Sequence, residues 1–186
     1  YNWGDYIGED VIEKFEDQYD CKVNYEMFEQ NEDMYTKLKT VENTYDVVIP
    51  SDYMIERMIN EGMLEELNKE NIPNLEHIIS YCLDRDFDPG NVYSVPYMWG
   101  TVGIIYNTTM VDEPITGWKD LWDEKYEKNL FMMNSVRDSM GIALILCGYD
   151  MNSRDPEEIE EAKNKLIEQK PLVLAYTGDE VKDKMV

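Results

Sequence analysis

Three short segments of the chain combine residue types that bind small cations. Gly4-Asp5-Tyr6, Ser51-Asp52-Tyr53 and Asn134–Asp138 each carry an aspartate, and the first two also carry a tyrosine. A carboxylate binds an ammonium group through charge-assisted hydrogen bonds. An aromatic face packs against the methylene groups of an amine and attracts its charge. Repeated along a groove, these residue types would hold an elongated polyamine, and Trp3 adds a further ring beside the first segment.

Each of these aspartates has a second interpretation, because a carboxylate at the start of a helix also serves as a cap. For a single aspartate the two interpretations are about equally favoured. Three such residues, Asp5, Asp52 and Asp138, in a chain that places aromatic rings beside two of them, favour a cation site.

The surrounding sequence alternates between strand and helix patterns, which indicates an α/β protein with parallel sheets and helices on their faces. In such sheets ligands bind beyond the carboxyl ends of the strands, and the three segments occupy these positions. The elements predicted before residue 92 are a strand ending at Trp3, a helix over 8–19, a strand over 22–28, a helix over 32–41 capped by Asn31, a strand over 46–50, a helix over 53–61 stopped by Gly62, and a short helix within 72–82.

The stretch Val92–Asn107 is predicted to be the crossing between two lobes. It is apolar and free of charged residues, with strand-like runs over 92–97 and 102–106. Residues 1–101 would then form lobe I, and residues 102–186 the crossing strand and part of lobe II. Tyr97, Met98 and Trp99 are predicted to pack in the core. The elements predicted beyond it are a helix over 118–122, a strand over 130–133, a helix over 135–147, a helix from the Asp155 cap to 169, a strand over 172–175 and the start of a helix over 179–185.

The charge balance is strongly acidic, with 40 acidic and 17 basic residues and a net charge of −23. Such a surface repels nucleic acid and attracts cations, so no nucleic-acid partner is expected, although solubility alone would explain the charge. Cys21, Cys82 and Cys147 form no metal-binding pattern, and His77 is the only histidine. The cysteines are expected to be buried free thiols, although a disulfide between two of them stays open. No metal or other cofactor is expected.

Two further interpretations concern acidic residues. Asp84, Asp86, Asp88 and Gly90 have the spacing of a calcium loop, but Val95 stands where the loop's final glutamate is expected, which favours an acidic surface turn. Alternatively, Asp5 and Asp138 could form the carboxylate pair of an acidic glycoside hydrolase.

Several segments, in order along nearly the whole chain, resemble the spermidine/putrescine-binding proteins of bacterial ABC importers. These segments are Tyr1–Tyr6 (YNWGDY), Asn31–Thr40 (NEDMYTKLKT), Tyr45–Tyr53 (YDVVIPSDY), Glu61–Leu64 (EGML) and Phe87–Gly100 (FDPGNVYSVPYMWG).

The resemblance implies a two-lobe clamshell of the type II periplasmic-binding-protein fold, without catalysis and incomplete at the C-terminus. The protein would lie in the periplasm or outside the cell, would deliver polyamine to a membrane permease, and would have further ligand residues beyond Val186. Self-association of the chain is one way in which the fold could be completed. A different small ligand for the same fold is the alternative. The predicted ligand-binding residues are Trp3, Gly4, Asp5, Tyr6, Ser51, Asp52, Tyr53, Ser135 and Asp138.

Within this set the resemblance implies that Trp3 stacks on the ligand and that Asp5 binds an amine. Ser51 and Tyr53 would contribute from the second turn, and Asp138 from the far lobe. Two positions depart from the family pattern. Gly4 replaces a frequent hydroxyl residue, and Ser135 stands where spermidine-binding members can offer a second carboxylate, which leaves the choice between spermidine and putrescine open.

Overall fold

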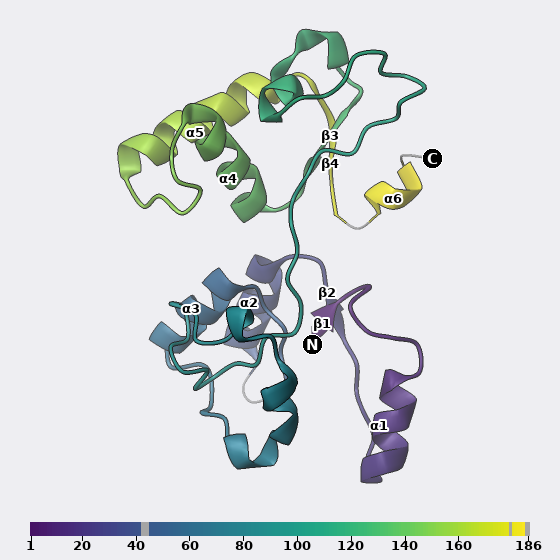
Figure 1. Cartoon of the computed structure of the whole chain (residues 1–186), viewed down its shortest axis with the longest axis vertical. Helices are drawn as coiled ribbons and strands as arrows, with labels where there is room; N and C mark the ends of the chain where they lie inside the picture. Colours follow the sequence, from purple (N-terminus) through teal and green to yellow (C-terminus); the bar gives the residue numbers. More distant parts are fainter. Residues whose placement is uncertain (42–44, 179, 185–186) are drawn as a thin grey trace. The chain divides into compact units, whose positions relative to one another are not determined.

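The computed structural model describes residues 1–41, 45–178 and 180–184 (Figure 1). The chain divides into two compact units, Tyr1–Gly100 and Thr101–Val186. The sequence prediction placed this boundary one residue later, and its assignment of the two units to lobes of one clamshell stays a prediction.

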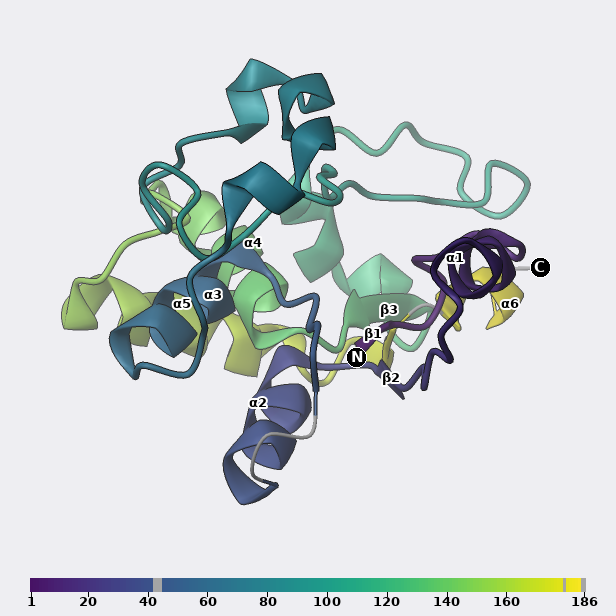
Figure 2. The same ribbon diagram turned by 90° about the horizontal axis from the view of Figure 1, so that it is seen from below.

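The first unit is built around a small parallel sheet. Strand β1 (Asn2–Trp3) pairs with β2 (Met27–Phe28), and the two lie side by side next to the N-terminus (Figures 1 and 2). The segment 47–49 lies along the other edge of β1, where the Tyr1 nitrogen donates to the Val47 oxygen at 2.9 Å and the Ile49 nitrogen donates to the Tyr1 oxygen at 3.0 Å. The strand predicted over 22–28 is much shorter in the structure, where it covers only Met27–Phe28. The segment predicted as a strand over 46–50 is held by backbone hydrogen bonds but is not a regular strand.

Three α-helices accompany this sheet: α1 (Val11–Tyr19), α2 (Asn31–Thr40) and α3 (Asp52–Asn60). The C-terminal end of α3 follows a local signal, because Gly62 adopts a positive φ of 67° just beyond the last turn of the helix. The core of the unit consists of Phe28, Met34, Tyr35, Met54 and Met58.

Helix α1 differs from the other two in having no buried residue. Its apolar residues Val11, Phe15 and Tyr19 lie on one face, as their spacing predicts, but all three are exposed. The helix stands apart from α2 and α3 in both ribbon views (Figures 1 and 2).

Helices α2 and α3 are joined by side-chain contacts at two places. Near their N-termini, the Asn31 amide nitrogen donates to Ser51 Oγ, and the Ser51 backbone nitrogen donates to Asn31 Oδ1, both at 3.0 Å. The prediction of Asn31 as the cap of α2 was wrong. Gln30 holds the cap position, and Asn31 is buried inside the first turn, where its side chain makes these hydrogen bonds to Ser51 at the start of α3.

The second contact centres on Glu61, just after α3. Its carboxylate accepts hydrogen bonds from the Tyr35 hydroxyl at 2.6 Å, from Lys39 Nζ at 2.9 Å and from Arg57 Nε at 3.0 Å. These donors, the tyrosine hydroxyl first, lower the pKa of Glu61 from its ordinary value of 4.5 to about 2.

The segment between α3 and the unit boundary contains short 3₁₀ helices in place of the single helix predicted within 72–82. They are η1 (Lys69–Asn71), η2 (Pro73–His77) and η3 (Ser80–Cys82). Ile78 and Ile79 separate the last two helices, and their ψ angles of 134° and 125° are not helical, which interrupts the helical hydrogen bonds.

The acidic turn that follows is closed by its own side chains. Asp88 is 2% exposed. Its carboxylate accepts from the backbone nitrogens of Val92 at 3.0 Å, Tyr93 at 3.1 Å and Ser94 at 2.8 Å, and from the Ser94 hydroxyl at 2.7 Å. Asp84 Oδ1 accepts from the Gly90 nitrogen at 2.7 Å. Protein donors thus occupy the carboxylates of Asp84 and Asp88, two of the three aspartates in the calcium-loop spacing.

The stretch Val92–Asn107 does not form the two predicted strands. It runs without regular secondary structure, and Tyr97, Met98 and Trp99 are 51%, 58% and 70% exposed. The prediction that these three side chains pack in the core was wrong. Strand propensity alone does not make a strand, because its backbone groups need a neighbouring strand to pair with.

The second unit also contains a parallel two-stranded sheet, with β3 (Leu130–Met133) beside β4 (Val173–Thr177). Helices α4 (Val136–Cys147) and α5 (Pro156–Gln169) pack against each other (Figure 1). The described elements are completed by η4 (Trp118–Trp122), η5 (Glu124–Tyr126) and α6 (Val181–Lys184). The predicted helix over 179–185 lies partly outside the described residues.

Local capping determines the start of both long helices in this unit. Ser135 Oγ accepts from the Asp138 nitrogen at 3.3 Å at the start of α4. Asp155 caps α5 by accepting from the Glu157 nitrogen at 2.8 Å, with Pro156 at the first helical position, as predicted.

The core of this unit forms two clusters. One holds Leu130, Met132, Ile142 and Val173, and the other Ala143, Leu144 and Ala162. Leu174 and Tyr176, on the opposite face of β4, remain 52% and 43% exposed.

All three cysteines are free thiols. Cys21 is exposed, and Cys82 and Cys147 are half-buried, so the prediction that the thiols are buried was wrong.

Candidate functional site

The turn after β1 carries the first group of predicted site residues. Trp3 is half-buried and packs against the core of the unit, with its ring 4.5 Å from that of Phe28 and 6.0 Å from that of Tyr6. Gly4 and Asp5 follow it and are exposed. The Tyr25 hydroxyl donates to the Trp3 oxygen at 3.3 Å, and the Tyr97 hydroxyl donates to the Tyr6 oxygen. The turn is therefore held on both sides, and Asp5 within it is exposed.

The start of α3 carries the second group. Ser51 is joined to Asn31 by the two hydrogen bonds described above. Asp52 is exposed, and its Oδ1 accepts from the Tyr53 nitrogen at 2.7 Å. Ser51 holds the cap position of α3, so Asp52 is not the cap of this helix. Tyr53 is half-buried, and its ring packs against the same core that supports Trp3.

The parallel arrangement explains why these two groups lie at one edge of the sheet. The turns that follow β1, β2 and the segment 47–49 leave from the same end, because the three backbones run in the same direction. Trp3 and Tyr53 consequently share a core, and Ser51 contacts the start of α2. Within the first unit Trp3 and Tyr53 pack against one core, and Asp5 lies on the turn after β1, so these residues could offer a carboxylate and aromatic faces to a cation.

A residue that the sequence analysis missed belongs to this edge. Glu32, in the first turn of α2, accepts a hydrogen bond from the Tyr53 hydroxyl at 2.9 Å between the hydroxyl oxygen and Oε1. The rule that selected the other turns would have found it, because the connection from β2 to α2 also follows the carboxyl end of a parallel strand.

The third group lies in the second unit, at the start of α4 directly after β3. Ser135 caps the helix through its hydroxyl, and Asp138 donates its backbone nitrogen to that cap. Both side chains are half-buried. Ser139, one turn in, is tied back to the strand by a hydrogen bond from its hydroxyl to the Met133 oxygen at 2.9 Å. Their predicted role as ligand contacts stays a prediction.

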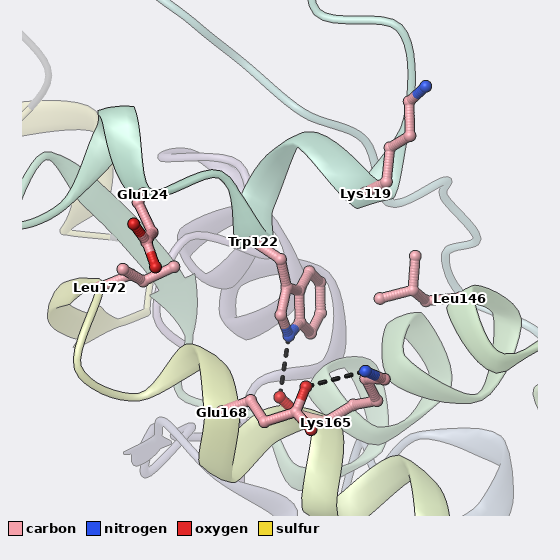
Figure 3. Close-up of a pocket in the computed structure, with 7 residues that line it drawn as sticks. All are labelled: Lys119, Trp122, Glu124, Leu146, Lys165, Glu168 and Leu172. Atoms are coloured by element: carbon pink, nitrogen blue, oxygen red, sulfur yellow. Dashed lines mark hydrogen bonds and ion pairs between the residues drawn. The ribbon is translucent and has the colours of Figure 1, made fainter.

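The second unit also contains a cavity of about 490 Å³ (Figure 3) that no predicted site residue lines. Trp122 projects into it and donates its indole nitrogen to the Lys165 oxygen at 2.8 Å, while Lys165 Nζ and Glu168 Oε2 form an ion pair at 2.8 Å. Trp118 and Trp122 both pack against the core. The Trp122 hydrogen bond joins η4 to α5, whereas the ion pair lies within α5.

The part of the chain that the structure describes offers neither a metal-binding cluster nor a helix that could span a membrane. Among the described residues, no group of three or more His, Cys, Asp or Glu side chains could hold a metal ion. In residues 1–41, 45–178 and 180–184, none of the helices has the length and apolar character that crossing a bilayer requires.

Comparison with known proteins identifies relatives over nearly the whole chain. The chain is 39% identical over 181 residues to the spermidine/putrescine-binding periplasmic protein of Salmonella typhimurium, covering 96% of this chain and 52% of that protein. It thus spans about half the length of the curated relatives that it matches.

Solved structures agree with this. A Listeria monocytogenes protein assigned to a spermidine/putrescine ABC transporter matches with a TM-score of 0.95 and 38% identity, over 100% of this chain and 58% of that one. The spermidine/putrescine ABC transporter substrate-binding protein of Streptococcus pneumoniae matches with a TM-score of 0.76 and 43% identity, over 100% of this chain and 57% of that one. This likeness confirms the predicted fold class. A sequence model of the bacterial extracellular solute-binding proteins matches residues 10–185, and the chain belongs to that family.

Proposed function

We propose that the protein binds a linear polyamine, spermidine or putrescine, and delivers it to the permease of an ABC importer. The observation that carries this proposal is the edge of the first unit's sheet, where Trp3, Tyr53 and the exposed carboxylate of Asp5 lie on turns supported by one core. Relatives that are 39% identical are named for spermidine and putrescine.

The chemistry of a polyamine suits these residues. Its ammonium groups carry only hydrogen-bond donors, so they need carboxylate, hydroxyl or carbonyl acceptors. Its methylene groups need apolar faces, which Trp3 and Tyr53 offer. Asp5 would bind one ammonium group, Ser51 and Tyr53 would add neutral acceptors, and Ser135 and Asp138 would contribute from the second unit. The net charge of −23 favours the approach of any cation.

The location and partner belong to the same proposal. The protein would act outside the cytoplasmic membrane, in the periplasm or at the cell surface, because the relatives are periplasmic proteins and one structural neighbour is a lipoprotein. It would catalyse no reaction. The chain matches a family of solute-binding proteins, which supports binding over the glycoside-hydrolase alternative built on Asp5 and Asp138.

Titration calorimetry on the natural protein tests the proposal. Putrescine and spermidine are expected to give saturable heat, whereas 1,4-butanediol, which keeps the carbon chain of putrescine but lacks both charges, is expected to give none. An absence of saturable binding with either polyamine would refute the proposal. Native mass spectrometry of the freshly purified protein separates the remaining alternative, because a retained sugar, amino acid or metal would have a different mass.

A further inference from the structure

Glu32, at the start of α2, accepts a side-chain hydrogen bond from Tyr53, an aromatic residue of the predicted site at the start of α3. We propose that Glu32 is a positioning residue, which orients the Tyr53 hydroxyl so that its oxygen accepts a hydrogen bond from the ligand's ammonium group. This inference rests on the proposed function and adds to it a residue and a means of selecting the ligand.

The Tyr53 side chain makes a packing contact and a hydrogen bond within the first unit. Its ring packs against the core of the first unit, which limits the direction of the side chain. Its hydroxyl donates to Glu32 Oε1 at 2.9 Å, which fixes the direction of the hydroxyl hydrogen. A tyrosine hydroxyl has one hydrogen and two lone pairs, so once the hydrogen points at Glu32 the oxygen can act towards a ligand only as an acceptor.

The position of Glu32 is itself well defined. It is the second residue of α2, immediately after Asn31, whose side chain is joined to Ser51 by two hydrogen bonds. The Thr36 hydroxyl donates to the Glu32 backbone oxygen at 2.8 Å one turn later. The starts of α2 and α3 are thus held together, and the distance from Glu32 to Tyr53 is set by the backbone.

This arrangement favours one class of ligand. An ammonium group donates hydrogen bonds and accepts none, so it matches an oxygen whose own hydrogen is already used. Donation to a charged acceptor also makes the hydroxyl oxygen a better acceptor in turn. A ligand that presents a carboxylate or carbonyl to Tyr53 would compete with Glu32 for the single hydrogen, and the site would select against it.

A simpler explanation is that Glu32 acts through its charge alone. The two explanations differ in what happens when the charge is removed but the acceptor is kept. In Glu32→Gln the amide oxygen still accepts from Tyr53, whereas in Glu32→Ala neither the charge nor the acceptor remains. They differ again in the Tyr53→Phe background. There the hydroxyl is missing, so a residue that acts only by orienting this hydroxyl should no longer affect the affinity.

The experiment is a double-mutant cycle read by calorimetry with putrescine. The natural protein is compared with Glu32→Gln, Glu32→Ala, Tyr53→Phe and the Glu32→Ala/Tyr53→Phe double variant, and thermal unfolding checks that each is folded. Glu29→Gln, which removes an exposed charge from the same connection, is the matched control.

The proposal expects Glu32→Ala and Tyr53→Phe each to weaken putrescine binding about tenfold. The double variant should bind putrescine about as tightly as either single variant. Glu32→Gln should stay within about threefold of the natural protein, and Glu29→Gln should not change the affinity. Additive losses, or a Glu32→Gln variant as weak as Glu32→Ala, would overturn the proposal. If Glu32→Ala does not fold, Glu32→Gln is measured both alone and combined with Tyr53→Phe. If Glu32→Gln lowers the affinity for putrescine by the same factor in both backgrounds, the proposal is overturned. A natural protein that binds no polyamine refutes the proposed function, and this inference falls with it.

Discussion

Replacing Asp88 by alanine should destabilise the first unit more than any other change to an acidic residue that we consider. The carboxylate is 2% exposed and accepts from three consecutive backbone nitrogens, those of Val92, Tyr93 and Ser94, as well as from the Ser94 hydroxyl. Asp88→Ala leaves these donors without their acceptor. At about 1 kcal/mol for each backbone hydrogen bond, the expected loss in the free energy of unfolding is about 3 kcal/mol.

A conservative variant tests whether the number of acceptor atoms matters. In Asp88→Asn one oxygen remains, but the amide nitrogen that replaces the other is itself a donor and meets the donors of Ser94. We therefore expect an intermediate loss of about 1–2 kcal/mol. Asp86→Asn is the matched control, because Asp86 is exposed in the same turn, and its effect should stay within about 0.5 kcal/mol.

The assay combines urea unfolding, followed by circular dichroism, with amide hydrogen exchange of the segment 84–94. In the natural protein the nitrogens that donate to Asp88 should exchange slowly, and in Asp88→Ala they should exchange at nearly the rate of an open loop. An Asp88→Ala protein as stable as Asp86→Asn, with unchanged exchange, would show that the carboxylate does not hold the loop.

Three further predictions address the site and its support. Asp5→Asn should weaken polyamine binding by about 1.5–3 kcal/mol in calorimetry if Asp5 holds an ammonium group, and an unchanged affinity would remove it from the site. Asn31→Ala should lower the free energy of unfolding by about 2 kcal/mol, because it leaves the Ser51 backbone nitrogen without its acceptor; a loss below about 0.5 kcal/mol in urea unfolding would contradict this. The pKa of Glu61 is lowered to about 2 in the folded chain, so its bonds stabilise fully above its ordinary pKa of 4.5 and are lost as the pH falls towards 2. The difference in melting temperature between the natural protein and Glu61→Gln should therefore be largest near pH 6 and shrink below pH 4.5, and a difference that does not change with pH would refute this assignment.

Features with local causes could be predicted from the sequence. The helix that starts at Asp155-Pro156 and the one that ends before Gly62 were located because caps, proline and glycine act on their own neighbours. The alternation of strands and helices predicted parallel sheets, and parallel sheets place the turns after their strands at one edge. This reasoning led to Trp3, Asp5, Ser51 and Tyr53.

What the sequence could not determine depends on partners that are distant along the chain. Val92–Asn107 has the composition of strands but pairs with no strand among the described residues, and Trp99 is exposed although its type favours burial. Asn31 was predicted as a cap, but its side chain forms hydrogen bonds with Ser51, 20 residues away. The contact between Tyr53 and Glu32 spans 21 residues. A helix closes its hydrogen bonds within four residues, so sequence reveals it, whereas a strand pairing or a contact between side chains exists only once the tertiary structure brings its two halves together.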